Sequence, residues 1–114
     1  MFQATKEEEG KVTYQEFLIQ VGMVGCKWFI DDETKNIYGK FDGDDRSYCP
    51  LTGVCKSLTG VYYTEGYWDS AALSLGLDVA LAERITDAAD DCGELEIRND
   101  LLRITNLAVI SGVK

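Results

Sequence analysis

The sequence contains no histidine. This absence excludes the Ser-His-Asp and Cys-His nucleophile systems, metal sites built on imidazole, and the side chain that most often acts as a general base near neutral pH. The 20 carboxylates permit many catalytic pairs, but no spacing singles out one of them. We therefore expect neither an enzyme nor a bound cofactor.

Positive charge is scarce as well, because 11 lysines and arginines face 20 acids and leave a formal net charge of -9. Proteins hold a nucleic-acid backbone by neutralising its phosphates with cationic side chains. A chain with this balance is poorly suited to that task, and duplex DNA is not the partner we expect.

Long apolar runs are missing too. The two longest uncharged stretches, residues 17–26 and 104–113, have ten residues each, about half the length of a membrane-spanning helix. The beginning of the chain carries Lys6 and the triplet Glu7-Glu8-Glu9 with no apolar segment behind them, unlike a secretory signal. We expect a soluble, cytoplasmic protein without a membrane segment.

The sequence also lacks the spacing of a metal site. Its 4 cysteines include no Cys-x-x-Cys pair, so they predict reduced thiols rather than a zinc site. The acidic loop at residues 42–47 places Arg46, Ser47 and Gly53 where a calcium loop needs a ligand, a glycine and a glutamate. We expect that loop to be a turn and assign no metal ligands.

What is present fits one domain over residues 1–114, with residues 1–11 polar and frayed. Thr13 and Glu16 have capping-box spacing, and the apolar positions that follow predict a helix over residues 13–22. Aromatic and β-branched residues at 26–30 and 37–41 flank a polar tip and predict a β-hairpin.

Three or four short helices are predicted after the hairpin. Pro50 marks the first turn of one of them, with Leu58 on its apolar face, and Gly60 ends it. A second helix ends at Gly76, and Asp78 can cap a third that Gly93 closes. Asn99 is the predicted cap of the last helix, and residues 94–98 are left as strand or loop. The predicted fold class is α+β, mainly helical.

The two helices around Gly76 resemble a helix-turn-helix. With Gly76 as the turn glycine, apolar or small residues fall on the buried positions Ala71, Ala72, Leu75, Leu77, Ala82 and Ile85. The outward positions of the second helix offer one arginine, Arg84, which is too little to contact base edges and phosphates. Packing is the favoured interpretation. The alternative is a nucleic-acid-binding module that adds Arg98, Arg103 and Lys114.

Negative charge is concentrated at residues 78–96, where seven acids accompany one base. On the predicted third helix the acids recur at helical spacing, on the face opposite the apolar one. The candidate interaction surface consists of Asp78, Glu83, Asp87, Asp90, Asp91 and Glu94. It suits a protein partner with a basic surface. An acidic face that serves only solubility is the commoner reason for such a stripe, and both interpretations stay open.

A third possibility is a self-assembling structural protein. It would associate through Trp28, Tyr62, Tyr63 and Tyr67 if these aromatic side chains were exposed.

Two stretches resemble known proteins. Residues 28–39 (WFIDDETKNIYG) resemble the aromatic hairpin that precedes the catalytic residues of phage-borne HNH-type nucleases, but the catalytic histidines of that family have no counterpart here. Within residues 48–92, the segment YCPLTGV and the later Trp68, Leu75-Gly76-Leu77 and residues 85–90 are similar to small proteins of phages and prophage-bearing bacteria. The second resemblance implies a phage or bacterial cytoplasmic setting and no particular activity.

Overall fold

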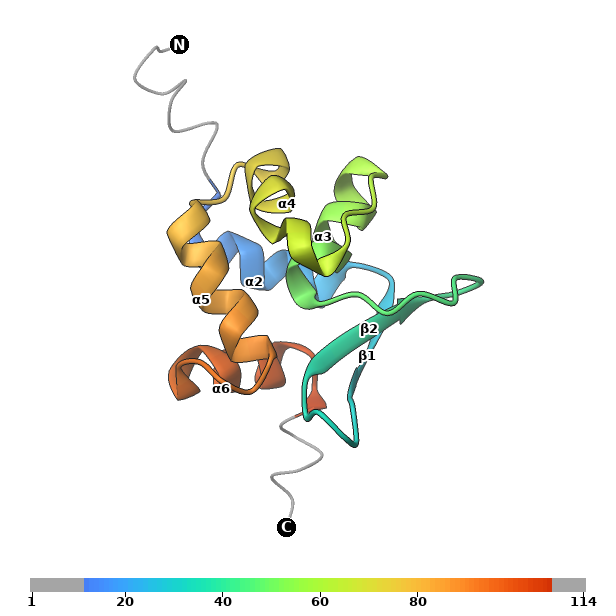
Figure 1. Ribbon diagram of the computed structural model, residues 1–114, viewed down its shortest axis with the longest axis vertical. Helices are drawn as coiled ribbons and strands as arrows, with labels where there is room; N and C mark the ends of the chain where they lie inside the picture. The colour runs from blue at the N-terminus through green and yellow to red at the C-terminus, as the bar shows by residue number, and fades with distance from the viewer. Residues whose placement is uncertain (1–11, 108–114) are drawn as a thin grey trace.

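The computed structural model describes residues 12–107 and is drawn in Figure 1. It confirms the α+β, mainly helical class. The elements in chain order are α2 (Tyr14–Met23), β1 (Cys26–Ile30), β2 (Ile37–Phe41), α3 (Pro50–Thr59), the 3-10 helix η1 (Glu65–Tyr67), α4 (Trp68–Leu75), α5 (Val79–Ala89) and α6 (Leu95–Ile104). None of the helices within the described residues has the length and apolar character that crossing a bilayer requires. The predicted fraying of residues 1–11 lies outside the described residues.

Helix α2 begins with the predicted capping box. The Thr13 hydroxyl accepts from the backbone N–H of Glu16 at 3.1 Å, and the Glu16 carboxylate accepts from the backbone N–H of Thr13 at 2.9 Å. These two bonds satisfy backbone donors that the first turn of a helix otherwise leaves without partners. The helix then buries Phe17, Leu18 and Val21 on one face.

The β-hairpin has the predicted strands, paired antiparallel with Trp28 opposite Gly39. The Trp28 indole N–H donates to the carbonyl of Val21 at 3.2 Å, which ties β1 to the end of α2. On its other edge, β2 is joined to Tyr48, because Gly39 and Tyr48 exchange two backbone hydrogen bonds of 2.7 and 2.9 Å. Figure 1 shows the hairpin beside the helical part of the molecule, with the loop that follows β2 extending outward.

Helix α3 begins at Pro50, as predicted, and Cys49 is its cap. The Cys49 sulfur accepts from the backbone N–H of Thr52 at 3.4 Å. Leu58 was predicted on the buried face but is 54% exposed, because the core contacts of α3 come from its first turns and its last turn extends beyond them.

Helices α4 and α5 have the predicted helix-turn-helix-like arrangement. Gly76 adopts a left-handed conformation (φ 78°) that L-residues with a side chain rarely tolerate, and it ends α4. The Asp78 carboxylate then accepts from the backbone N–H of Leu81 at 3.0 Å and caps α5. Five of the six predicted inward positions are buried, and the sixth, Leu75, is half-buried.

The last helix begins earlier than predicted. α6 begins at Leu95, so residues 95–98 are helical rather than strand or loop, and Asn99 lies within the helix instead of capping it. Ile97 and Leu101, four residues apart, are the buried positions of this helix. The helix has no side-chain cap, because the side chain of Glu94 makes no capping bond. The burial of Ile97 and Leu101 against α5 and α2 stabilises the helix without one.

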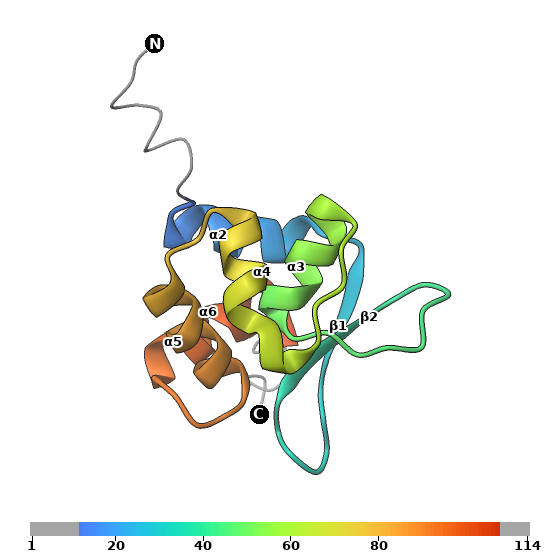
Figure 2. The ribbon, with the colours of Figure 1, turned by 45° about the horizontal axis from the view of Figure 1, so that its top comes forward.

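The helices surround a core shared by all of them. α5 packs between α4 and α6, α3 packs against α4, and α6 returns to contact α2 (Figure 2). The C-terminal half of α5 and the turn after it therefore form one outer corner of the molecule, which carries most of the predicted acidic surface.

Candidate functional site

The six predicted surface acids lie on α5 and on the turn between α5 and α6. Asp78, Glu83, Asp87, Asp91 and Glu94 are exposed, and Asp90 is partly buried. Helical geometry places Glu83 and Asp87 one turn apart on α5. The six residues differ in what they contact.

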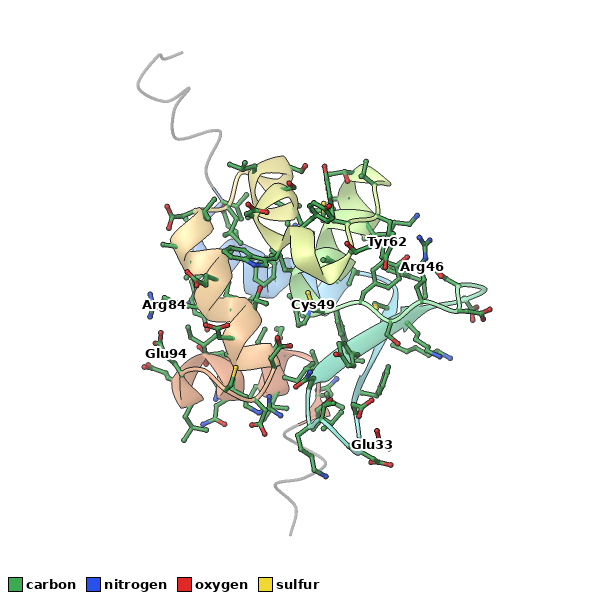
Figure 3. The ribbon with its side chains drawn as sticks, in the orientation of Figure 1. Glu33, Arg46, Cys49, Tyr62, Arg84 and Glu94 are labelled. Carbon is green, nitrogen blue, oxygen red and sulfur yellow. The ribbon has the colours of Figure 1, made fainter. Side chains whose placement is uncertain are left out.

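Glu94 is engaged by Arg84, the one base of this region. The Arg84 guanidinium donates two hydrogen bonds to the Glu94 carboxylate, of 2.6 and 2.8 Å, and Figure 3 shows the two side chains together at the edge of the molecule. These hydrogen bonds lower the pKa of Glu94 and raise the pKa of Arg84. Both side chains are about half exposed, so the pair contributes little to stability. It does, however, neutralise the only outward arginine of α5.

Asp91 is engaged by Arg98, which α6 directs back toward α5. The Arg98 guanidinium lies 3.4 Å from the Asp91 carboxylate. It also donates to the carbonyls of Ala88 and Ala89, at 2.9 and 3.3 Å, and to the carbonyl of Lys35 in the hairpin turn, at 2.6 Å. With a side chain only 12% exposed, Arg98 is part of the scaffold and offers no cationic surface.

The described arginines that the nucleic-acid alternative requires are therefore already paired with carboxylates. Arg84 and Arg98 are paired as described, and Arg103 is paired with Asp100 on α6. Lys114 lies outside the described residues. The three described arginines do not form a free basic surface that could contact phosphates.

Glu83 and Asp87 remain as the uncompensated part of the stripe. Among residues 12–107, no lysine or arginine lies within ion-pair distance of either carboxylate. One carboxylate oxygen of Asp78 already accepts the capping hydrogen bond from Leu81. The charge available to a partner is thus centred on the middle and the C-terminal end of α5.

A hollow of about 380 Å³ adjoins this charge, between the beginning of α4 and the end of α5. It is lined by Cys49, Gly66, Trp68, Thr86, Asp87 and Asp90. Trp68 packs against the core and leaves part of its side chain exposed at this hollow. Three segments far apart in the sequence contribute to its walls, so no local pattern could have indicated it.

Cys49 is the nucleophile nearest to this hollow, and Figure 3 labels it in the middle of the molecule. It is 5% exposed, and burial raises the pKa of its thiol. A thiol held neutral in this way is a weak nucleophile and a structural cap of α3. In the described part of the chain, no group of three Cys, Asp or Glu side chains is arranged to hold a metal ion.

The aromatic residues of the self-assembly alternative do not gather on one exposed patch. Tyr67 is 61% exposed, whereas Trp28, Tyr62 and Tyr63 are partly buried. Tyr62 is covered by the guanidinium of Arg46, which lies 4.1 Å from the ring centroid. Figure 3 shows these two residues next to each other above the hairpin.

The loop at residues 42–47 is a turn, as predicted. Its Asp44 carboxylate accepts hydrogen bonds from the Arg46 side chain and from the Tyr48 hydroxyl, and these bonds lower the pKa of Asp44.

Comparison with known proteins assigns no family. The chain matches no protein-family model, and neither a curated protein nor a solved structure matches it. The function has to be argued from the geometry described above.

Proposed function

We propose that this protein is a non-catalytic interaction module of the cytoplasm, and that the acidic face of α5 binds a basic surface of a partner protein. The observation that carries the proposal is the pair Glu83 and Asp87, two exposed carboxylates one helical turn apart with no ion-pair partner in the described residues.

The placement of the bases around this face supports the proposal. Arg84 and Arg98, the cations nearest in sequence, are held by Glu94 and Asp91 and by backbone carbonyls. They cannot swing over to neutralise the middle of α5 without breaking those bonds. A carboxylate pair that stays uncompensated attracts a cationic partner and steers its approach, more strongly at low salt.

The similarity of residues 48–92 to phage and prophage proteins supports a bacterial setting. In that setting the partner is a host protein, and the module acts by occupying its basic surface. This assignment rests on the resemblance, and the experiment below addresses the binding face independently of it.

The test compares two variants with equal charge change. The double variant E83K/D87K reverses the proposed face, and the control D32K/E33K reverses two exposed acids in the hairpin turn. Partners are captured from the native host at low salt by the wild-type chain and both variants, then identified by mass spectrometry. Binding of each purified partner is measured by titration at several salt concentrations.

We expect E83K/D87K to lose its partner while D32K/E33K retains it, with an affinity that falls as salt is added. If both variants lose binding equally, net charge alone attracts the partner. If neither does, the face of α5 is not the binding surface. Either result would overturn the proposal.

A further inference from the structure

The hollow beside Asp87 has the size and the wall chemistry of a side-chain pocket. Its volume of about 380 Å³ lies within the range of sites that hold small ligands, and is far too small for a helix or a strand. Trp68, the first residue of α4, contributes aromatic surface, and Asp87 contributes a carboxylate without an ion-pair partner in residues 12–107. An aromatic ring beside a carboxylate favours a cation.

Thr86 provides a second, independent observation. Its Oγ1 is buried and has no hydrogen-bond partner in the described structure, although the residue as a whole is partly exposed and lines the hollow. A buried hydroxyl without a partner is unfavourable, and native proteins rarely keep one.

The position of the Thr86 hydroxyl depends on the rotamer of this side chain. Threonine in a helix divides between two χ1 rotamers, and a 120° turn about χ1 moves the hydroxyl oxygen to a different side of the Cβ atom. Because Thr86 lines the hollow, a hydroxyl turned toward it could accept a hydrogen bond from a ligand N–H.

The position of the hollow on α5 favours the same sign of charge. Thr86 and Asp87 belong to the last turn of this helix, which ends at Ala89. The carbonyl groups at a helix C-terminus carry partial negative charge and attract cations. Arg98 already binds two of the carbonyls at this end, on Ala88 and Ala89.

We propose that this hollow receives one arginine side chain of the partner, with the guanidinium against Trp68, donating hydrogen bonds to the Asp87 carboxylate and to the rotated Thr86 hydroxyl. A guanidinium fits better than an ammonium group, because it is planar, stacks on aromatic rings and donates to several acceptors at once. The inference rests on the proposed function and adds the chemical group that is recognised.

The probe is the capped tripeptide acetyl-Gly-Arg-Gly-amide, and its control carries citrulline, which has nearly the same shape without the charge. Amide and indole chemical shifts of the ¹⁵N-labelled chain are followed as each peptide is added to millimolar concentration. We expect shifts centred on the Trp68 indole N–H and on the amides of Thr86 and Asp87. Binding of the citrulline peptide should be about tenfold weaker or more.

Two uncharged substitutions separate the pocket from the acidic stripe. Thr86→Val removes the hydroxyl while keeping the shape, and Trp68→Leu removes the ring; neither changes the charge of α5. Thr86→Val should weaken arginine binding without lowering the unfolding midpoint, because it deletes a buried polar group that has no partner. Glu33→Gln, at an exposed acid of the hairpin turn that does not line the hollow, should leave binding of the short peptide nearly unchanged.

The inference is overturned if the arginine and citrulline peptides shift the same signals equally, if neither shifts any signal, or if the shifts centre on Glu83. It is also overturned if Thr86→Val binds the arginine peptide as tightly as the wild-type chain. Loss of partner capture by E83K/D87K would still uphold the proposed function in each of these cases. A free arginine amide that binds as tightly as the peptide would indicate a small-molecule site and overturn recognition of a partner's side chain.

Discussion

Trp28 lies against two glycines, and this contact joins the hairpin to the helical part of the molecule. A Cβ atom built on Gly39 would lie 2.6 Å from the Trp28 ring and would also overlap the sulfur of Cys26. A Cβ on Gly53 of α3 would lie 3.2 Å from the far edge of the same ring. The absence of these two methyl groups lets the indole lie between β2 and α3.

Gly39→Ala should therefore lower the free energy of unfolding by about 1–3 kcal/mol, the usual cost of forcing an extra carbon into a packed site. The indole cannot move away easily, because its N–H is bonded to the carbonyl of Val21. Chemical denaturation monitored by tryptophan fluorescence measures the change.

Gly25→Ala is the matched control for this substitution. A Cβ at Gly25 meets no atom within 4 Å, so we expect its effect to stay below about 1 kcal/mol in either direction. Equal destabilisation by the two substitutions would contradict the role given to Trp28.

At the scale of elements, Arg98 joins α6 to the end of α5 and to the hairpin turn, which lies 63 residues away in the chain. Its guanidinium binds the last carbonyls of α5, the carboxylate of Asp91 in the following turn and the carbonyl of Lys35 in the hairpin turn. The hairpin turn is thereby attached to the corner formed by α5 and α6.

Arg98→Ala should lower the free energy of unfolding by about 2–3 kcal/mol, because it leaves carbonyls that had accepted charge-assisted hydrogen bonds. Arg103→Ala is the control, since the side chain of Arg103 is 64% exposed and, within residues 12–107, its ion pair is with Asp100. Its effect should be less than about 1 kcal/mol. Urea denaturation of both variants provides the comparison, and similar losses would rule out the special role of Arg98.

The elements also show where sequence reasoning succeeds. The capping box at Thr13, the hairpin strands and the turn at Gly76 were predicted because each depends on residues close together in the chain. The start of α6 was missed for a related reason. Leu95 and Ile97 alternate as in a strand, and only their packing against other helices selects the helical spacing of Ile97 and Leu101.

The candidate site was also predictable from the sequence only in part. The acidic composition of α5 was readable from the sequence, but the pairing of Arg84 with Glu94 depends on the turn that brings α6 back to α5. The hollow was not predictable, because Cys49, Trp68 and Thr86 come from three helices whose arrangement no local pattern specifies. What a partner could bind is thus a property of the packing as well as of the charge.

At the scale of the whole molecule, tyrosine hydroxyls supplement the arginines that pair with Asp100 and Asp44. Tyr14 donates to Asp100 at 2.6 Å, and Tyr48 donates to Asp44. Burial and the nearby carboxylate raise the pKa of both tyrosines, that of Tyr48 to about 12.

Stability should consequently fall in alkaline solution. In the unfolded chain tyrosines lose their protons near pH 10, at about their ordinary pKa, whereas Tyr14 and Tyr48 keep theirs in the folded state. Their contribution is complete below about pH 10 and is lost as the pH rises toward and beyond the folded values. Urea denaturation at a series of alkaline pH values measures this decline.

The double variant Y14F/Y48F has no ionisable hydroxyl at either position, so its stability should decline less steeply with pH. It should be less stable near neutrality, because two hydrogen bonds are lost. Parallel declines for the variant and the wild-type chain would show that these hydroxyls do not couple ionisation to folding.

The contact between α2 and α6 closes the fold from its two ends. Tyr14 and Asp100 are 86 residues apart in the chain, and a Cβ on Gly22 would touch the side chain of Ile104. During synthesis on the ribosome, α2 emerges before α6 and cannot pack against it until α6 has left the exit tunnel. Until then part of the apolar face of α2 stays exposed in the nascent chain, a state that chaperones covering apolar surface can protect.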